Sequence, residues 1–169
     1  KIFLDRFEND KGKIKETLKS LKMRKIIAGV DEVGRGCLAG PVVSAAVILK
    51  QGVQIKNLRD SKKLTFKQRI EVSKDIKNNS LFSIGIASVK EIEKLNILQA
   101  SLLSMKRAIL SLPKKPDLVL VDGIFAPQLL IKCKTVIKGD EKINCISAAS
   151  ILAKVYRDKL MIRMSKKFK

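Results

Sequence analysis

The sequence predicts an α/β protein with a mixed β-sheet and helices on both of its faces. The first observation is that three of the strand-like segments come early in the chain, before residue 90. The second is that the later strand-like segments alternate with amphipathic helices. The chain has 169 residues, of which 46% are hydrophobic, and this is enough for one domain with its own core.

Five segments have the apolar, β-branched composition of strands. The first ends at two adjacent acids, and a glycine-rich turn joins it to the second. The predicted strands span residues 26–31, 40–49, 81–89, 117–123 and 133–140.

Four segments have the apolar spacing of helices. Ile14, Leu18 and Leu21 form an i, i+4, i+7 stripe in the first of them. Thr65 is the expected N-cap of the second, and Pro113 stops the third. The predicted helices span residues 10–23, 65–78 and 96–112, and the last begins at about residue 144.

The charge of the chain predicts a polyanionic partner. Lys and Arg number 36 against 16 Asp and Glu, which gives a formal net charge of +20, far more than solubility requires. Nucleic acid is the leading candidate. An AT-rich genome that inflates the lysine content is the alternative, but it does not explain the paired acids. The segment from Lys154 onward is strongly basic, suited to a phosphate track or simply solvated.

The absence of some residue types limits which metal sites and catalytic groups the chain can have. The chain has no histidine and its three cysteines form no CxxC pair, so neither a zinc site nor a disulfide framework is indicated. Catalysis would then depend on carboxylates, lysines, thiols or metals. No secretory signal is visible, because charged residues interrupt the opening segment, and no apolar run reaches the ~18 residues of a membrane span. We therefore expect a soluble, cytoplasmic protein with no membrane partner. We also expect a monomer.

Three aspartates follow predicted strands. Asp31 closes the first strand, Asp122 closes the fourth, and Asp140 lies at the end of the fifth. If the strands of Asp31 and Asp122 are adjacent and parallel, about 4.8 Å separates their backbones, and the side chains lie together where open α/β sheets bind ligands. A common turn after a strand is the alternative explanation for Asp122 or Asp140 taken singly.

Glu32 directly follows Asp31, and successive side chains of a regular strand point to opposite faces. We therefore expect the chain to bend at these acids, which Gly34 and Gly36 would allow. Hard divalent cations best explain such a cluster of carboxylates, because Mg²⁺ takes oxygen ligands and shares its sites with substrate phosphate. Two ions about 3.5–4 Å apart can activate water and stabilise a leaving oxygen without any histidine.

Five blocks of the sequence occur together in a fixed order. They are DEVGRGCLAGPVV (31–43), DSKKLT (60–65), LNILQASLLSM (95–105), LVDG (120–123) and KGDEKINCISAASILAKVYRD (138–158). The combination of DExGRG with SAASILAKVxRD is far more specific than any one short motif. The blocks resemble the ribonuclease HII family, the type 2 ribonucleases H, over most of the chain from residue 26 to residue 158.

This resemblance implies a ribonuclease H-like fold, a mixed five-stranded sheet flanked by helices, and the activity of a metal-dependent endoribonuclease. The family cuts the RNA strand of RNA/DNA hybrids, and the strand at single ribonucleotides embedded in duplex DNA, and leaves 5′-phosphate and 3′-hydroxyl ends. The resemblance places the catalytic carboxylates at Asp31, Glu32, Asp122 and Asp140, which would hold two Mg²⁺ or Mn²⁺ ions.

Other positions shared with the family are expected to bind substrate. Backbone groups of Gly34, Arg35 and Gly36 would approach the sugar closely enough to sense a 2′-hydroxyl, or the loop is only a tight turn. Ser61 and Lys62 would hold a backbone phosphate, with a solvated loop as the alternative. A β-branched residue at Gly34 or Gly36 is expected to impair cleavage more than folding.

The chain departs from the family near its C-terminal end, where the family usually continues to a tyrosine that stacks on the sugar at the RNA–DNA junction. The only tyrosine here is Tyr156, inside the last predicted helix. Either the sequence is incomplete at that end or junction discrimination is weakened. About 25 residues precede the first strand, too few for the extra N-terminal domain of ribonuclease HIII. We therefore expect a single catalytic domain over residues 1–169.

Asp140 is the least secure of the four proposed catalytic carboxylates. Glu141 and Asp158 lie nearby in the sequence and remain alternatives to it as the metal ligand.

Two other functions stay open at this point. A non-catalytic nucleic-acid-binding protein would have the basic surface but no reason to gather acids beside it. A junction resolvase, another ribonuclease H-like nuclease, would cut an all-DNA junction.

Overall fold

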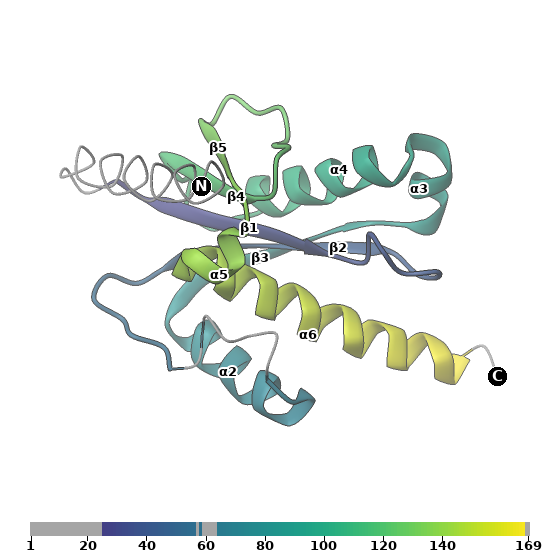
Figure 1. The fold of residues 1–169 in the computed structure, drawn as a ribbon, viewed down its shortest axis with the longest axis horizontal. Helices are drawn as coiled ribbons and strands as arrows, with labels where there is room; N and C mark the ends of the chain where they lie inside the picture. Colours follow the sequence, from purple (N-terminus) through teal and green to yellow (C-terminus); the bar gives the residue numbers. More distant parts are fainter. Residues whose placement is uncertain (1–24, 57, 59–63, 168–169) are drawn as a thin grey trace, which may run out of the picture.

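The computed structural model describes residues 25–56, 58 and 64–167 of the chain (Figure 1). The predicted helix over residues 10–23 lies outside these residues, and so do Ser61 and Lys62. Within the described part, no helix combines the length and the apolar character that crossing a membrane requires.

Five strands of the described chain form one mixed sheet in the order β3-β2-β1-β4-β5. β1 (Ile27–Val33), β2 (Val42–Leu49) and β3 (Ser80–Ala87) are antiparallel neighbours. β4 (Leu118–Asp122) pairs parallel with β1, and β5 (Cys133–Val136) pairs parallel with β4. The predicted mixed five-stranded sheet is confirmed, and β1 lies at its centre with one antiparallel and one parallel neighbour.

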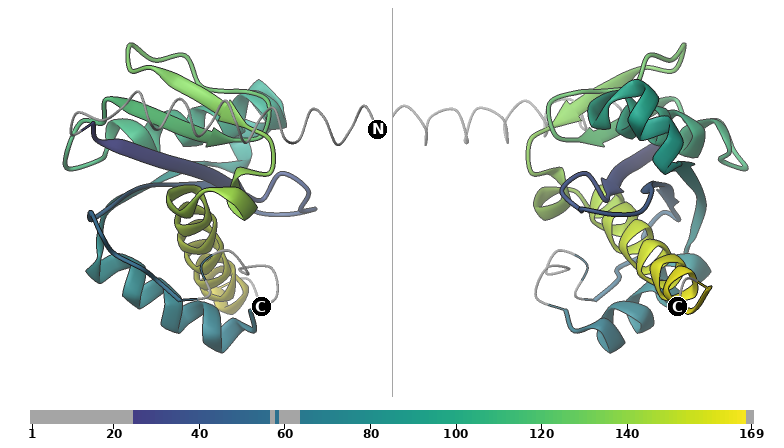
Figure 2. Two further views of the ribbon diagram at one scale, coloured as in Figure 1. Left: turned by 60° about the vertical axis from the view of Figure 1, so that its left-hand side comes forward. Right: turned by 90° about the vertical axis from the view of Figure 1, so that its right-hand side faces the viewer.

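Helices cover both faces of the sheet, as predicted (Figures 1 and 2). α4 (Ile97–Leu110) lies on one face against β2 and β3, and α3 (Val89–Leu95) leads into it. α6 (Asn144–Lys167) lies on the other face against β1 and β2, and α2 (Phe66–Asn78) packs against α6. Separate apolar clusters fill the space on the two faces.

Two short helices differ from the prediction. The strand predicted to run to residue 89 ends at Ala87, because a capping box formed by Ser88 and Glu91 starts α3. The strand predicted over residues 133–140 ends at Val136. The chain then turns through Lys138, whose φ is 54°, into α5 (Gly139–Lys142).

A close approach between β1 and α6 fixes where the acids of β1 lie. A Cβ on Gly29 would overlap the backbone of Cys145 and Ile146, so only glycine lets the first turn of α6 lie directly on the strand. Two residues further along β1, Asp31 is buried beneath this helix, within reach of Ser150.

Candidate active site

Asp31 and Asp122 lie next to each other at the edge of the sheet. The parallel ladder of β1 and β4 ends with Val30 opposite Val121, so the next residue on each strand is an aspartate. Parallel neighbours are about 4.8 Å apart, which confirms that the two strands bring these acids side by side. Asp31 is only 6% exposed, so its carboxylate is almost fully removed from water.

The surroundings of Asp31 disfavour its negative charge. Burial raises the pKa of Asp31 well above its usual range, and the neighbouring charges of Glu32 and Asp122 raise it further. Two hydrogen bonds act in the opposite direction, one from the side chain of Ser150 and one from the backbone N–H of Glu32, 2.7 Å from Oδ1. The raised pKa shows that these two hydrogen bonds do not offset burial and repulsion.

Glu32 and Arg35, both predicted site residues, form an ion pair with each other at 3.4 Å. Burial raises the pKa of Glu32, Arg35 lowers it, and the charge of Asp122 raises it. The predicted bend at these acids is wrong: β1 stays paired with β2 through Val33 opposite Val43, and the strand ends only before Gly34. The antiparallel ladder with β2 holds the acids in regular strand geometry.

Asp140 reaches the site from α5 rather than from the end of a strand, which corrects the prediction. Asp122 Oδ1 accepts hydrogen bonds from the backbone N–H of Gly139 (2.6 Å) and of Asp140 (3.4 Å), so the turn into α5 is built on Asp122. Asp140 is 6% exposed. Of its two alternatives, Glu141 is exposed and Asp158 pairs with Lys154 at 2.7 Å, so Asp140 is the one buried beside Asp122.

The two glycines of the predicted substrate loop have different surroundings. Gly34 has a φ of 113°, and a Cβ there would lie 2.8 Å from Arg157 Nε and 2.8 Å from the carbonyl oxygen of Pro41. A Cβ on Gly36 would meet no atom of the described residues within 4 Å. Gly34 is therefore required by the protein's own backbone and neighbours, whereas the space beside Gly36 is open.

The donor atoms at this edge fit a hard divalent cation by their chemistry. They are carboxylate oxygens, and the chain contains no histidine. A cation would also relieve the repulsion that raises the pKa of Asp31. Within the described part of the chain, no three His, Cys, Asp or Glu side chains are already grouped to hold a metal ion, and Glu32 is turned towards Arg35.

Three residues of α6 contribute to the site in ways that the sequence did not predict. Ser150 hydrogen-bonds Asp31, and the Ser147 hydroxyl donates to the backbone carbonyl of Asp140. Arg157 is buried under the loop that carries Gly34. The burial of Arg157, though not its partners, could have been found from its spacing, because it lies four and eight residues after the buried Ala153 and Ala149.

Comparison with protein families identifies the chain. Residues 28–169 match the family model described as Ribonuclease HII. The chain belongs to the ribonuclease HII family. A ribonuclease HII of Pelagibacter ubique (strain HTCC1062) is 61% identical over 145 residues, which cover 85% of this chain and 78% of that protein. A ribonuclease HII of Trichodesmium erythraeum (strain IMS101) is 54% identical over 152 residues, which cover 83% and 70%.

Solved structures agree with this assignment. The ribonuclease H2 of Pyrococcus horikoshii OT3 superposes with a TM-score of 0.71 at 29% identity, covering 84% of this chain and 76% of that one. The ribonuclease HII of Archaeoglobus fulgidus, solved in complex with PCNA, gives 0.64 at 26% identity, covering 85% and 77%. A Bst-RNase HIII in complex with Mn²⁺ gives 0.69 at 16% identity, covering 85% and 55%, and shows a likeness of fold. The predicted ribonuclease H-like fold is confirmed, and this member of the ribonuclease HII family is an endonuclease.

Proposed function

We propose that the chain is a divalent-metal-dependent endoribonuclease that acts on RNA/DNA hybrids and on single ribonucleotides embedded in duplex DNA. It leaves 5′-phosphate and 3′-hydroxyl ends. Family membership implies endoribonuclease activity on RNA/DNA hybrids. The observation that carries the rest is the burial of Asp31 directly beside Asp122, whose charge raises the pKa of Asp31. Such a pair is unfavourable unless a cation shares the site.

The residues that would hold two Mg²⁺ or Mn²⁺ ions are the four acids Asp31, Glu32, Asp122 and Asp140. When bound, a pair of divalent ions supplies activation of the attacking water and stabilisation of the leaving oxygen. The chain's own contribution is to hold Asp31 and Asp122 on adjacent parallel strands and to bury Asp140 on the turn that Asp122 caps. Glu32 would exchange its partner Arg35 for a cation.

Substrate recognition is assigned to Gly34, Arg35 and Gly36. The side chain of Arg35 and the backbone at Gly36 are exposed beside the acids, and the open space at Gly36 leaves room for a sugar. A 2′-hydroxyl there could both donate and accept hydrogen bonds, which distinguishes RNA from DNA. Ser61 and Lys62 lie outside the described residues, and their contact with a phosphate stays a prediction.

The net charge of +20 supports a duplex nucleic acid as the partner. Counterion release makes log affinity fall linearly with log salt, by about 0.9 for each phosphate neutralised on duplex DNA. Binding to a hybrid or a ribonucleotide-containing duplex is therefore expected to weaken steeply with salt. An affinity that hardly changes with salt would mean that the positive charge reflects the amino-acid composition of the source genome and does not serve nucleic-acid binding.

The test of the proposal is a set of three matched substrates with and without divalent ions. A DNA duplex with one ribonucleotide should be cut at that residue in Mg²⁺ or Mn²⁺ and not in EDTA, with 5′-phosphate and 3′-hydroxyl products. The same duplex with deoxyribose only should stay intact. Cleavage that continues in EDTA, or equal cutting of both duplexes, would refute the proposal. Cutting of an all-DNA four-way junction would indicate a resolvase, and tight binding without any cleavage would indicate a binding protein.

A monomeric state, a cytoplasmic location and a single catalytic domain over residues 1–169 are part of the same proposal. The monomer is checked by the mass of the purified protein in solution at several concentrations.

A further inference from the structure

Arg157 on α6 is a buried cation whose partners are backbone carbonyls. It is 6% exposed, and no carboxylate among the described residues forms an ion pair with it. Its Nε donates to the carbonyl of Pro41 at 3.0 Å and its Nη2 donates to the carbonyl of Ala39 at 2.7 Å. A buried guanidinium is unfavourable unless hydrogen bonds satisfy it, so these contacts tie the helix to that segment of chain.

Both carbonyls belong to the segment that joins β1 to β2, here named the glycine loop (residues 34–40), and to the proline that follows it. The loop begins and ends with glycines of positive φ, 113° at Gly34 and 89° at Gly40. A Cβ on Gly40 would lie 2.5 Å from Met161 Sδ and 3.4 Å from Arg157 Nη2. Arg157 and Met161 are four residues apart on one face of α6, so the two ends of the loop rest on this face.

The middle of the glycine loop has few other contacts. Residues 35–39 are exposed, and within the described chain the loop's further hydrogen bonds are the one from Cys37 N–H to the carbonyl of Gly34 (3.3 Å) and the pair of Arg35 with Glu32 (3.4 Å). Both of these contacts are local and neither connects the loop to a helix. Beyond its covalent links to β1 and β2, the hydrogen bonds that hold the loop against a helix within the described chain are therefore those from Arg157.

We propose that Arg157 is a positioning residue for cleavage. It holds the glycine loop so that the backbone at Gly34 and Gly36 stands at a fixed place beside Asp31 and Glu32. It does so without touching the substrate, because the side chain is buried and its donors are directed at the loop carbonyls. This inference rests on the proposed function, which places the substrate sugar against the same loop.

Burial distinguishes Arg157 from other basic residues of the C-terminal segment. Lys159 and Arg163 on the same helix are exposed and are free to act as phosphate contacts, whereas Arg157 is not. Removal of an exposed cation should weaken binding through its charge. Removal of Arg157 should instead slow the bound substrate's cleavage, because the reacting groups become misplaced.

The experiment compares Arg157→Met, Arg157→Lys and the control Arg163→Met. Arg163→Met removes the same charge from an exposed position of the same helix. Cleavage of a duplex with one ribonucleotide is measured well below the unfolding temperature of each variant, and kcat and KM are determined separately. Arg157→Met is expected to lose roughly tenfold to a hundredfold in kcat, since a misplacement of about 1 Å costs on the order of a hundredfold. Arg163→Met is expected to change KM and to keep kcat. Arg157→Lys keeps the charge but cannot span both carbonyls, and its kcat should lie between those of Arg157→Met and the wild type.

A second readout needs no substrate. Amide hydrogen exchange of the peptide covering residues 34–41 should be faster in Arg157→Met, less so in Arg157→Lys, and unchanged in Arg163→Met. Equal kcat in Arg157→Met and Arg163→Met, or a higher KM as the sole effect, would overturn the positioning role while the wild type still cleaves. If Arg157→Met does not fold, Arg157→Lys decides: a wild-type kcat with wild-type exchange would overturn the proposal. A wild type that cuts no ribonucleotide refutes the proposed function instead, and the exchange data alone then report on the contact.

Discussion

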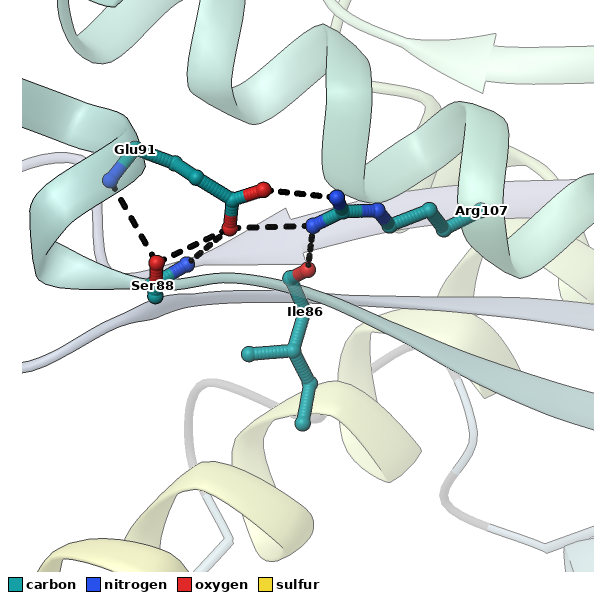
Figure 3. Close-up of polar contacts among 4 residues, drawn as sticks. All are labelled: Ile86, Ser88, Glu91 and Arg107. Carbon is teal, nitrogen blue, oxygen red and sulfur yellow. Dashed lines mark hydrogen bonds and ion pairs between the residues drawn. The ribbon is translucent and has the colours of Figure 1, made fainter. Parts of the chain in front are cut away.

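The pKa of a carboxylate is shifted in opposite directions at the edge of the sheet, where Asp31 lies, and at the start of α3, where Glu91 lies. Glu91 accepts hydrogen bonds from the Arg107 guanidinium at 2.6 and 3.0 Å and from the backbone N–H and hydroxyl of Ser88 at 2.8 and 2.9 Å (Figure 3). These partners, Arg107 first, lower the pKa of Glu91 to about 2. At Asp31, burial, followed by the charges of Glu32 and Asp122, raises the pKa.

The opposite pKa shifts indicate that Glu91 stabilises the fold and that Asp31 has a role other than stability. Arg107 also donates to the carbonyl of Ile86 at 2.6 Å, so one guanidinium joins the end of β3 to α3 and α4 (Figure 3). The carboxylate of Glu91 is thus compensated by the chain itself. At Asp31, the hydrogen bonds from the chain compensate only part of the cost of burying a negative charge beside other acids. This is unfavourable for folding, and it is typical of sites that bind a positive charge from outside the chain.

Removal of the charge at the edge of the sheet is expected to have the largest effect. Asparagine keeps the shape of aspartate without its charge, so Asp31→Asn or Asp122→Asn should slow cleavage of a ribonucleotide-containing duplex by on the order of a thousandfold. Binding measured without divalent ions should survive or strengthen, because a negative charge beside the phosphate is lost. The control is Glu91→Gln, which should cut at the wild-type rate. Cleavage by Asp31→Asn at the wild-type rate would contradict the assignment of the site.

The two glycines of the loop provide the next test of the comparison. Gly36→Val is expected to fold normally and to lose about a hundredfold in kcat, because the added side chain occupies open space where the sugar would lie. Gly34→Val should lower the unfolding temperature as well, since its φ of 113° and its contact with Arg157 Nε exclude a β-branched residue. For Gly34 we therefore expect an effect on folding in addition to the effect on cleavage, whereas for Gly36 we expect an effect on cleavage alone. Unfolding temperature and kcat are measured on each variant, and a poorly folded Gly36→Val would show that the space is not free.

The parts of the site that follow from strand geometry were predictable from the sequence. Asp31 and Asp122 each end an apolar run, and strands that end alike at one edge bring their last residues together. The contribution of Arg157 could not be predicted in the same way, because Pro41, which accepts its hydrogen bond, is 116 residues away in the chain. Asp140 was assigned to a strand because nothing in the sequence signals a positive φ at Lys138.

The start of α3 shows a different kind of limit. Ser88 and Glu91 have the spacing of a capping box, but the apolar pattern of the preceding strand extends to Val89 and predicts a strand across this helix start. The ion pair of Glu91 with Arg107, 16 residues apart, requires the turn at Asn96 that brings α4 back along α3. The capping-box spacing is a local signal for the start of α3, whereas the ion pair of Glu91 with Arg107 can be identified only from the folded structure.

A smaller effect is expected on stability in the absence of metal. Burial raises the pKa of Asp31, so the folded protein holds the ionised form unfavourably, and the free energy of unfolding falls as pH rises above the ordinary pKa. Asp31→Asn should therefore raise the free energy of unfolding at neutral pH in EDTA, by about 1 kcal/mol. Excess Mg²⁺ should stabilise the wild type and reduce the difference. Urea unfolding of both proteins in EDTA and in Mg²⁺ measures this, and a less stable Asp31→Asn would mean that the hydrogen bonds to Asp31 outweigh the repulsion.

The smallest effect is expected at Glu91, and it should have the opposite dependence on pH. The folded-state pKa of Glu91 is about 2 against an ordinary value of 4.5, so its contribution is fully present above 4.5 and is lost as pH falls towards 2. Glu91→Gln keeps the N3 residue type of a capping box but loses the ion pair with Arg107, so it should be less stable than the wild type near neutral pH. The difference should shrink as pH falls through the window. Glu93→Gln changes an exposed glutamate of the same helix and is the matched control. Urea midpoints of the three proteins, taken at intervals between about pH 6 and about pH 3, test the prediction. A difference between Glu91→Gln and the wild type that stays constant across this range would show that the ionised form of Glu91 adds nothing to stability.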